Sequence, residues 1–142
     1  MLAEVAAEMG WRCLAYCLMG NHVHLLIETT EPNLGAGMHR LQMGYAKWFN
    51  ERHGRSGHLF QGRFGSVRMR SEAQLWATVA YIVKNPLDAG LCDQPEDWPW
   101  NGHRYVVRDE PPAWLEVDRL LSFFAAAGGN PRDAYVAITS ED

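Results

Sequence analysis

The chain has 142 residues, of which 47% are apolar and 21% are charged, enough to bury one ordinary core in a single soluble domain. It contains no run of about 20 apolar residues and no basic start followed by an apolar stretch, so we expect neither a membrane partner nor a secretory signal. Without either segment, a cytoplasmic location is the default expectation. The net charge of −4, taken alone, argues against a nucleic-acid partner.

The first 28 residues predict the end of a helix followed by a hairpin. Residues 1–9 have the character of the last turns of a helix, and Gly10 occupies the position where a left-handed C-cap residue is favoured. Residues 11–18 and 21–28 are rich in strand formers and are separated only by a Met-Gly pair. This arrangement predicts two antiparallel strands.

A second helix and an extended arm are predicted in the middle of the chain. Residues 29–37 indicate a loop by their Pro, Asn and Gly content. From 34 to 52, apolar residues recur every three or four positions, which predicts an amphipathic helix that overlaps the end of this loop. A glycine-rich turn over 53–58 then leads into 59–69, which we interpret as an extended arm and strand.

The next predicted helix begins at a capping box, since Ser71 is followed three residues later by Gln74. We expect it to end near Asn85, because Pro86 biases the residue before it away from the helical region. A last apolar helix is predicted over 114–127, after a stretch rich in Pro, Trp and acidic residues.

Charge is distributed unevenly along the chain. Residues 37–70 carry seven Lys or Arg against one acid, whereas residues 86–142 carry four against eleven. A basic block in an acidic chain is typical of a phosphate-binding surface, although a solvated helix face would also be basic. Both interpretations remain open on charge alone.

The second predicted strand carries the pattern His22-Val23-His24. Alternate residues of a strand point to the same face, so the two imidazoles would lie about 7 Å apart along the chain and could share one metal ion. An isolated pair of this kind more often decorates an exposed strand face. The motif therefore needs support from elsewhere in the sequence.

Tyr81 lies in the predicted helix that follows Ser71, opposite its core stripe. That stripe consists of Leu75, Trp76, Val79, Ile82 and Val83. Small or polar residues surround Tyr81, so it is a candidate for a chemical role, although tyrosine is usually held by burial of its ring. Asn85 shares this face one turn along and could add an amide oxygen to a cation site, or could simply cap the helix before the proline.

Four strings occur in register along residues 11–127, namely YCLMGNHVHLLIET, HGRSGHLFQGRFGS, YIVKNPLDAGL and PEDWPW. In this order and at these intervals they resemble the REP-associated tyrosine transposases. These enzymes belong with the single-tyrosine HUH transposases of insertion sequences. Four linked motifs are far more specific than any one of them.

The resemblance implies an α+β fold with a ferredoxin-like antiparallel sheet and helices on one face. It implies that His22 and His24 are metal ligands, that Asn85 is a third ligand and that Tyr81 is the nucleophile. The cofactor would be a divalent cation, magnesium or manganese. The reaction would be cleavage and transfer of single-stranded DNA through a 5′-phosphotyrosine, in the manner of transposition.

The basic block acquires a specific role from the resemblance, since the family's glycine-rich segment lies near bound DNA. The partner would be single-stranded or hairpin DNA. The expected DNA-binding residues are Lys47, Arg52, Arg55, Gln61, Arg63 and Arg70. A monomer and a homodimer are both open.

One departure from the family concerns the start of the chain. Members begin with a strand and a full helix before the segment matched by Trp11, whereas this chain starts inside that helix. We expect an incomplete transposase domain over 1–110 and a helical extension over 111–142. The alternatives to a strand-transferase are an inactive remnant that only binds DNA hairpins and a small metal-binding protein unrelated to DNA.

Overall fold

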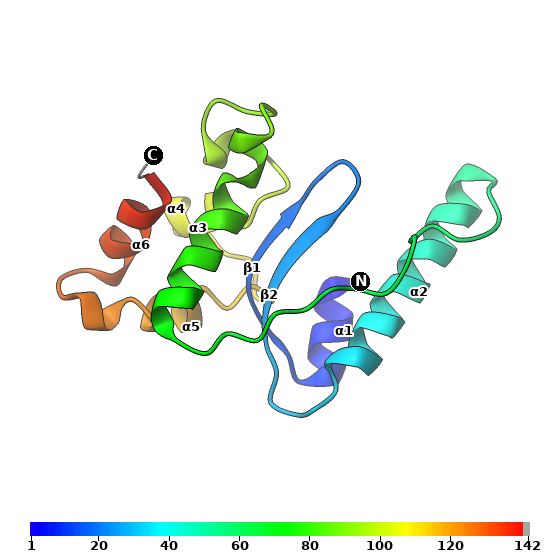
Figure 1. Ribbon diagram of the computed structural model, residues 1–142, viewed down its shortest axis with the longest axis horizontal. Helices are drawn as coiled ribbons and strands as arrows, with labels where there is room; N and C mark the ends of the chain where they lie inside the picture. Colours follow the sequence, from blue (N-terminus) through cyan, green and yellow to red (C-terminus); the bar gives the residue numbers. More distant parts are fainter. Residues whose placement is uncertain (141–142) are drawn as a thin grey trace. The chain divides into compact units, whose positions relative to one another are not determined.

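The computed structural model describes residues 1–140 and confirms the α+β class (Figure 1). The elements in chain order are α1 (Leu2–Met9), β1 (Arg12–Leu18), β2 (Val23–Glu28), α2 (Leu34–His53), α3 (Glu72–Asp88), η1 (Pro95–Asp97), α4 (His103–Arg108), α5 (Val117–Ser122), η2 (Ala125–Ala127) and α6 (Pro131–Ser140). None of the helices within 1–140 has the length and hydropathy of a membrane span.

The chain divides into two compact units. The helical unit contains residues 1–11 and 29–68, with α1 and α2. The sheet unit contains residues 12–28 and the chain from 69 onward, with the hairpin and the remaining helices. The predicted division at residue 110 is a different one and stays a prediction.

In the helical unit, the predicted helices are confirmed and their ends are fastened by Asn33. Gly10 ends α1 with a left-handed φ of 67°, as expected. The indole Nε1 of Trp11 donates to Asn33 Oδ1 at 2.8 Å, and Asn33 Nδ2 donates to the carbonyl of Met9 at 2.8 Å. Gly37 on α2 faces the Trp11 ring so closely that a Cβ there would lie 2.1 Å from it. These contacts join α1 to the start of α2.

Two expectations for the helical unit are wrong. The loop predicted over 29–37 ends earlier, because α2 already begins at Leu34. The strand predicted within 59–69 does not form. A strand needs a neighbour that bonds to its backbone, and no described strand pairs with this segment. Its side chains pack on α2 instead, with the Phe60 ring 6.2 Å from that of Tyr45.

The hairpin is the centre of the sheet unit. Strands β1 and β2 pair antiparallel, and this is the one sheet among residues 1–140, where a larger ferredoxin-like sheet was expected. On its other edge β1 forms backbone hydrogen bonds of 2.9 Å with Trp100, Gly102 and Glu116. Residues 13–17 of β1 are buried. The strand is thus held on both edges, and it fixes the position of β2.

Helix α3 packs between the hairpin and α6 (Figure 1). Its predicted capping box forms in a variant geometry, because the Gln74 amide donates to Ser71 Oγ at 3.2 Å while Gln74 Oε1 accepts at 2.9 Å from the amide of Arg70 and not from that of Ser71. The predicted end near Asn85 is wrong, since α3 continues through Pro86 to Asp88. In the last turn proline removes only one helical hydrogen bond, and its ring is buried here.

The C-terminal helices are shorter and more numerous than predicted. The helix expected over 114–127 is divided into α5 and η2, and α4 and α6 were not predicted. Phe124 and Tyr135 are almost fully buried, and their rings meet edge to face at 5.6 Å. Aromatic packing therefore completes the core behind α3.

Candidate active site beside strand β2

Two histidines lie at the start of β2. His22 directly precedes the strand and is exposed, while His24 lies within it, opposite Cys17, and is half-buried. Their ring centroids are 4.9 Å apart and their planes are nearly perpendicular, at 86°. The structure thus places the two imidazoles side by side, as a shared ligand requires.

Tyr81 meets this pair from α3. Its ring lies 5.2 Å from that of His24, edge to face at 79°. The side chain is 55% exposed, whereas Ile82 and Val83 beside it are buried in the core. Tyr81 is therefore not a core residue, because more than half of its surface is open to solvent.

The Nε2 atom of His24 is buried and forms no hydrogen bond. Burial lowers the pKa of His24 and the neighbouring His22 lowers it further, while the nearby Asn85 side chain opposes part of the shift. An unsatisfied buried nitrogen costs roughly 1–3 kcal/mol. A neutral imidazole with an unoccupied lone pair is the form that binds a metal ion.

The orientation of His22 is fixed by a residue that the sequence reasoning missed. Asn21 Oδ1 accepts a hydrogen bond of 2.7 Å from His22 Nδ1. Because an amide oxygen can only accept, Nδ1 is the donor in this hydrogen bond. Such partners of metal-binding histidines are common. The only sequence signal was the position of an amide side chain directly before the pair.

Asn85 is the remaining candidate ligand. It lies one turn after Tyr81 on α3 and is half-buried. No group of three or more His, Cys, Asp or Glu side chains that could hold a metal exists in the part of the chain that the structure describes. A third protein donor beside the two histidines would thus be the amide oxygen of Asn85. Two imidazole nitrogens and an amide oxygen could hold a divalent cation and leave positions open for a substrate.

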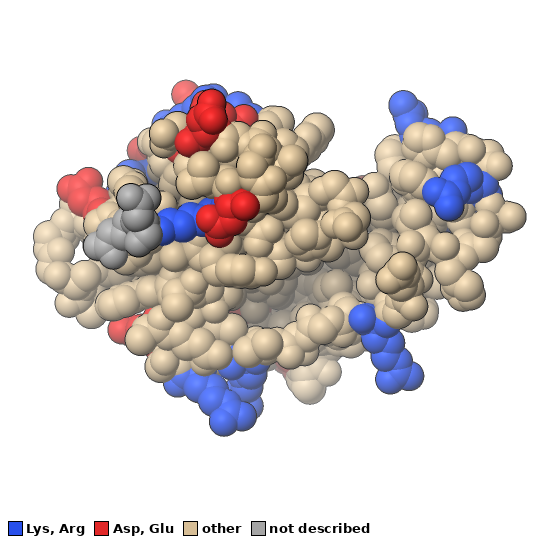
Figure 2. All heavy atoms as spheres, turned by 45° about the horizontal axis from the view of Figure 1, so that its top comes forward, with Lys and Arg blue, Asp and Glu red and all other residues tan. Residues whose placement is uncertain are grey.

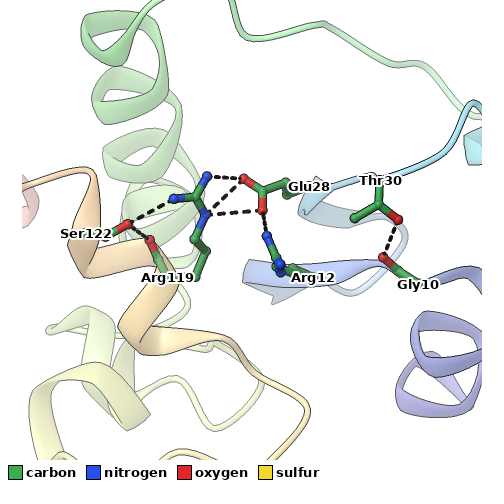
Figure 3. A network of polar contacts seen from close by, with 6 residues as sticks. All are labelled: Gly10, Arg12, Glu28, Thr30, Arg119 and Ser122. Atoms are coloured by element: carbon green, nitrogen blue, oxygen red, sulfur yellow. Dashed lines mark hydrogen bonds and ion pairs between the residues drawn. The ribbon is translucent and has the colours of Figure 1, made fainter.

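At its other end, β2 is fastened by an ion-pair network (Figure 3). Glu28 accepts from Arg12 Nη1 at 2.6 Å and from Arg119 Nη2 at 2.6 Å. The Arg119 hydrogen bonds lower the pKa of the Glu28 carboxyl, and those of Arg12 add to the shift. This network joins both strands to α5, and nothing in the sequence indicated a pairing of residues 91 positions apart. In the helical unit, Figure 3 also shows Thr30 Oγ1 donating to the carbonyl of Gly10 at 3.2 Å.

The six predicted DNA-binding residues are all exposed. Five of them, Lys47, Arg52, Arg55, Gln61 and Arg63, belong to the helical unit, and Arg70 lies in the sheet unit directly before α3. On the face drawn in Figure 2, the coloured side chains over α2 and the segment after it are basic.

A family model described as "Transposase IS200 like" matches residues 1–85, a range that includes both histidines, Tyr81 and Asn85. The chain belongs to the IS200-like transposase family. A Haemophilus influenzae protein provisionally named a REP-associated tyrosine transposase is 23% identical over 141 aligned residues, which cover 90% of this chain and 73% of that protein. No solved structure matches. Membership in a transposase family supports DNA transposition as the general function of this IS200-like transposase and a DNA-cleaving activity.

Proposed function

We propose that this transposase cleaves and rejoins single-stranded DNA at hairpin or palindromic sequences, with Tyr81 as the nucleophile. The observation that carries the proposal is the contact between the exposed Tyr81 ring and His24, whose buried Nε2 has no partner. An exposed tyrosine beside an imidazole nitrogen that makes no hydrogen bond within the protein is the arrangement that metal-assisted phosphoryl transfer needs.

The covalent steps are as follows. The hydroxyl oxygen of Tyr81 bonds to the scissile phosphorus, the bond from phosphorus to the 3′ oxygen breaks, and the phenol proton is lost while the 3′ oxygen gains one. The products are a 5′-phosphotyrosine and a free 3′-OH. A different 3′-OH then attacks the phosphotyrosine and releases Tyr81. The bond energy is kept in the adduct, so no nucleotide cofactor is needed.

His22, His24 and Asn85 would hold a divalent cation, magnesium or manganese. When bound, the cation polarises the scissile phosphate and stabilises the charge that develops on its oxygens, an effect of several kcal/mol. The protein's own part is orientation: Asn21 hydrogen bonds to the His22 ring, burial lowers the pKa of His24 and so favours its neutral form, and α3 brings the Tyr81 ring beside that of His24.

The exposed basic residues would neutralise the DNA backbone. The candidate cations are Lys47, Arg52, Arg55, Arg63 and Arg70, and the uncharged Gln61 would add a hydrogen bond. If about five cations contact single-stranded phosphates, log K should fall with log salt at a slope near −3.5, from about 0.7 per contact. Such a slope would support backbone contacts that do not depend on sequence.

The test is a covalent adduct. The full chain is incubated with manganese and a single-stranded oligonucleotide that carries the palindrome flanking its gene, and the adduct is separated by denaturing electrophoresis. We expect an adduct with the wild-type chain and with Tyr105→Phe, which removes the hydroxyl of a half-buried tyrosine on α4, and none with Tyr81→Phe. An adduct that persists in Tyr81→Phe would refute the role of Tyr81.

The same assay separates the alternatives. Salt-sensitive DNA binding without an adduct at any manganese concentration would support a protein that binds hairpins but does not cleave them. A wild-type chain with no affinity for single strands would support a metal-binding protein unrelated to DNA. Either result would overturn the proposed strand transfer.

A further inference from the structure

Three large aromatic side chains lie exposed on the helical unit. Tyr45 and Trp48 on α2 are 41% and 46% exposed, and Phe60 in the segment after α2 is 37% exposed. The Tyr45 ring lies 5.6 Å from that of Trp48 and 6.2 Å from that of Phe60. We refer to these three residues as the aromatic face. Contiguous exposed aromatic surface of this kind usually marks a binding site.

Guanidinium groups lie among these rings. Arg52 is 5.8 Å from the centroid of Trp48, and Arg55 is 5.9 Å from that of the half-buried Phe49. Both arginines are exposed, and neither forms an ion pair with a described carboxylate. Residues 52–68 contain four arginines and no acidic residue. The cations beside the aromatic face are therefore available to an anionic ligand.

We propose that the aromatic face is a subsite for unpaired bases of single-stranded DNA, stacked on Trp48 and its neighbours while Arg52 and Arg55 contact the adjoining phosphates. This inference rests on the proposed DNA substrate and adds the mode in which that substrate is held. Rings flanked by free guanidinium groups match the two parts of a nucleotide, an aromatic base and a phosphate. Such a surface binds single strands regardless of sequence.

The charge of this surface disfavours a second copy of the chain as its occupant. In a two-fold dimer the same patch meets itself, so the unpaired arginines of one copy would face those of the other, and Glu51, the single acid of α2, already pairs with Lys47. A single strand of DNA supplies one negative charge per nucleotide. Charge complementarity therefore favours DNA over self-association.

A hollow continues this surface toward the start of α2. It has a volume of about 270 Å³ and is lined by Gly35, His39, Gln42, Arg63 and Phe64. The last two residues come from the segment that also carries Phe60, so that segment lies along α2 from the aromatic face to the hollow. The hollow thus offers the ring of Phe64, the amide of Gln42 and the guanidinium of Arg63, which are groups that can bind a base and a phosphate.

The experiment compares two ligands that differ only in their bases. Fluorescence anisotropy is used to measure binding of the full chain to an end-labelled dT dodecamer and to an abasic dodecamer with the same number of phosphates. We expect Trp48→Ala to weaken dT binding about tenfold, within the range measured for loss of one stacked base, and abasic binding less than twofold. Met43→Ala, a change at a 61% exposed apolar residue of the same helix, should alter neither.

Two further variants keep the test informative. Trp48→Phe preserves a stacking ring and should retain most of the dT affinity. Arg52→Ala and Arg55→Ala should weaken both ligands alike, and each should flatten the salt slope by about 0.7. A Trp48→Ala chain that binds both ligands as the wild type does, or that loses both equally, would overturn the subsite. A lower sedimentation mass in Trp48→Ala with unchanged dT affinity would instead assign the face to self-association.

The outcome is separable from that of the proposed function. All binding measurements are repeated in the Tyr81→Phe chain, which makes no adduct under the proposal. Base-dependent loss of affinity in Trp48→Ala without any wild-type adduct would contradict strand transfer but support the aromatic face. A wild-type adduct, together with no effect of Trp48→Ala on the binding of either ligand, would support strand transfer but contradict the aromatic face.

Discussion

The two units of this transposase differ in what they bury and in what they leave exposed. The sheet unit carries seven Lys or Arg against thirteen acids, buries a continuous core, and contains every proposed catalytic and metal-binding residue. The helical unit carries six Lys or Arg against four acids and buries few large side chains, chiefly Val5, Trp11 and Met38. The proposed chemistry thus belongs to the densely packed unit, and five of the six proposed DNA contacts belong to the sparsely packed one.

This difference is physically reasonable. A reacting group must be held within a fraction of an ångström, which needs packed neighbours such as the β1 edge contacts and the Glu28 network around β2. A surface that binds flexible single strands needs charge and flat rings more than rigidity. Three stability measurements test this difference between the units.

The largest effect is expected from acid titration of the sheet unit. His103 is 6% exposed, its Nδ1 lies 2.9 Å from the Tyr135 hydroxyl, and burial lowers its pKa to about 4, with Glu96 opposing the shift. The folded state favours the neutral ring of His103. The contribution of this residue to the free energy of unfolding is therefore fully present above the unfolded pKa near 6.5, and it is lost as the pH falls toward 4. The free energy of unfolding should drop by about 3 kcal/mol across that window.

Urea unfolding at half-unit pH steps checks this expectation. His103→Gln keeps a polar side chain without a titrating group, and its stability should vary much less between pH 6.5 and 4.5. That range lies above the region where Glu28, whose pKa is lowered, begins to lose its ion pairs. Parallel pH profiles for wild type and His103→Gln would contradict the assignment.

The second measurement concerns the small core of the helical unit. A Cβ at Gly37 would lie 2.1 Å from the Trp11 ring, a distance that requires a shift of the helix or of the indole. Gly37→Ala should destabilise the helical unit by about 2 kcal/mol, as overpacking does. Gly35→Ala is the matched control, since no atom lies within 4 Å of its Cβ; it should be neutral or stabilise by up to about 1 kcal/mol.

Hydrogen exchange resolved by segment is the appropriate readout. In Gly37→Ala, protection should fall in α1 and α2 while that of α3 and β1 changes less. Equal losses of protection in both units would show that they unfold together, so the difference between the units would not extend to their stability.

The sequence predicted the elements that depend on local chemistry. Three features that each depend on residues close together in the sequence are confirmed. They are the Gly10 cap, the hairpin and the Ser71–Gln74 capping box. The sequence also predicted that His22 and His24 lie side by side, although β2 begins only at Val23. The exposed position of Tyr81 follows from helix periodicity.

The features that were missed depend on distant partners. The 59–69 strand failed because pairing requires a neighbour that local propensity does not report. Helix α3 passes Asn85 because burial of Pro86 compensates for its poor local fit. The Glu28–Arg119 pair connects strand and helix across most of the chain. No pattern of spacing predicts such contacts.

The smallest expected effect concerns this Glu28 network. Glu28→Gln removes the charge that Arg12 and Arg119 share and turns an amide group toward a guanidinium. The Glu28 side chain is 23% exposed, so solvent screens part of the interaction, and we expect a loss of about 1 kcal/mol in the free energy of unfolding. Glu4→Gln in the helical unit is the control, because Glu4 is 79% exposed and its single ion pair among residues 1–140 is with the N-terminal amine; it should change stability by less than about 0.3 kcal/mol. Urea unfolding in low and high salt distinguishes the two variants. The difference in the free energy of unfolding between the wild type and Glu28→Gln should shrink as salt screens the ion pairs.

Equal effects of Glu28→Gln and Glu4→Gln would mean that the network does not hold β2 in place. The rigid support proposed for His24 would then have to come from the β1 pairing alone.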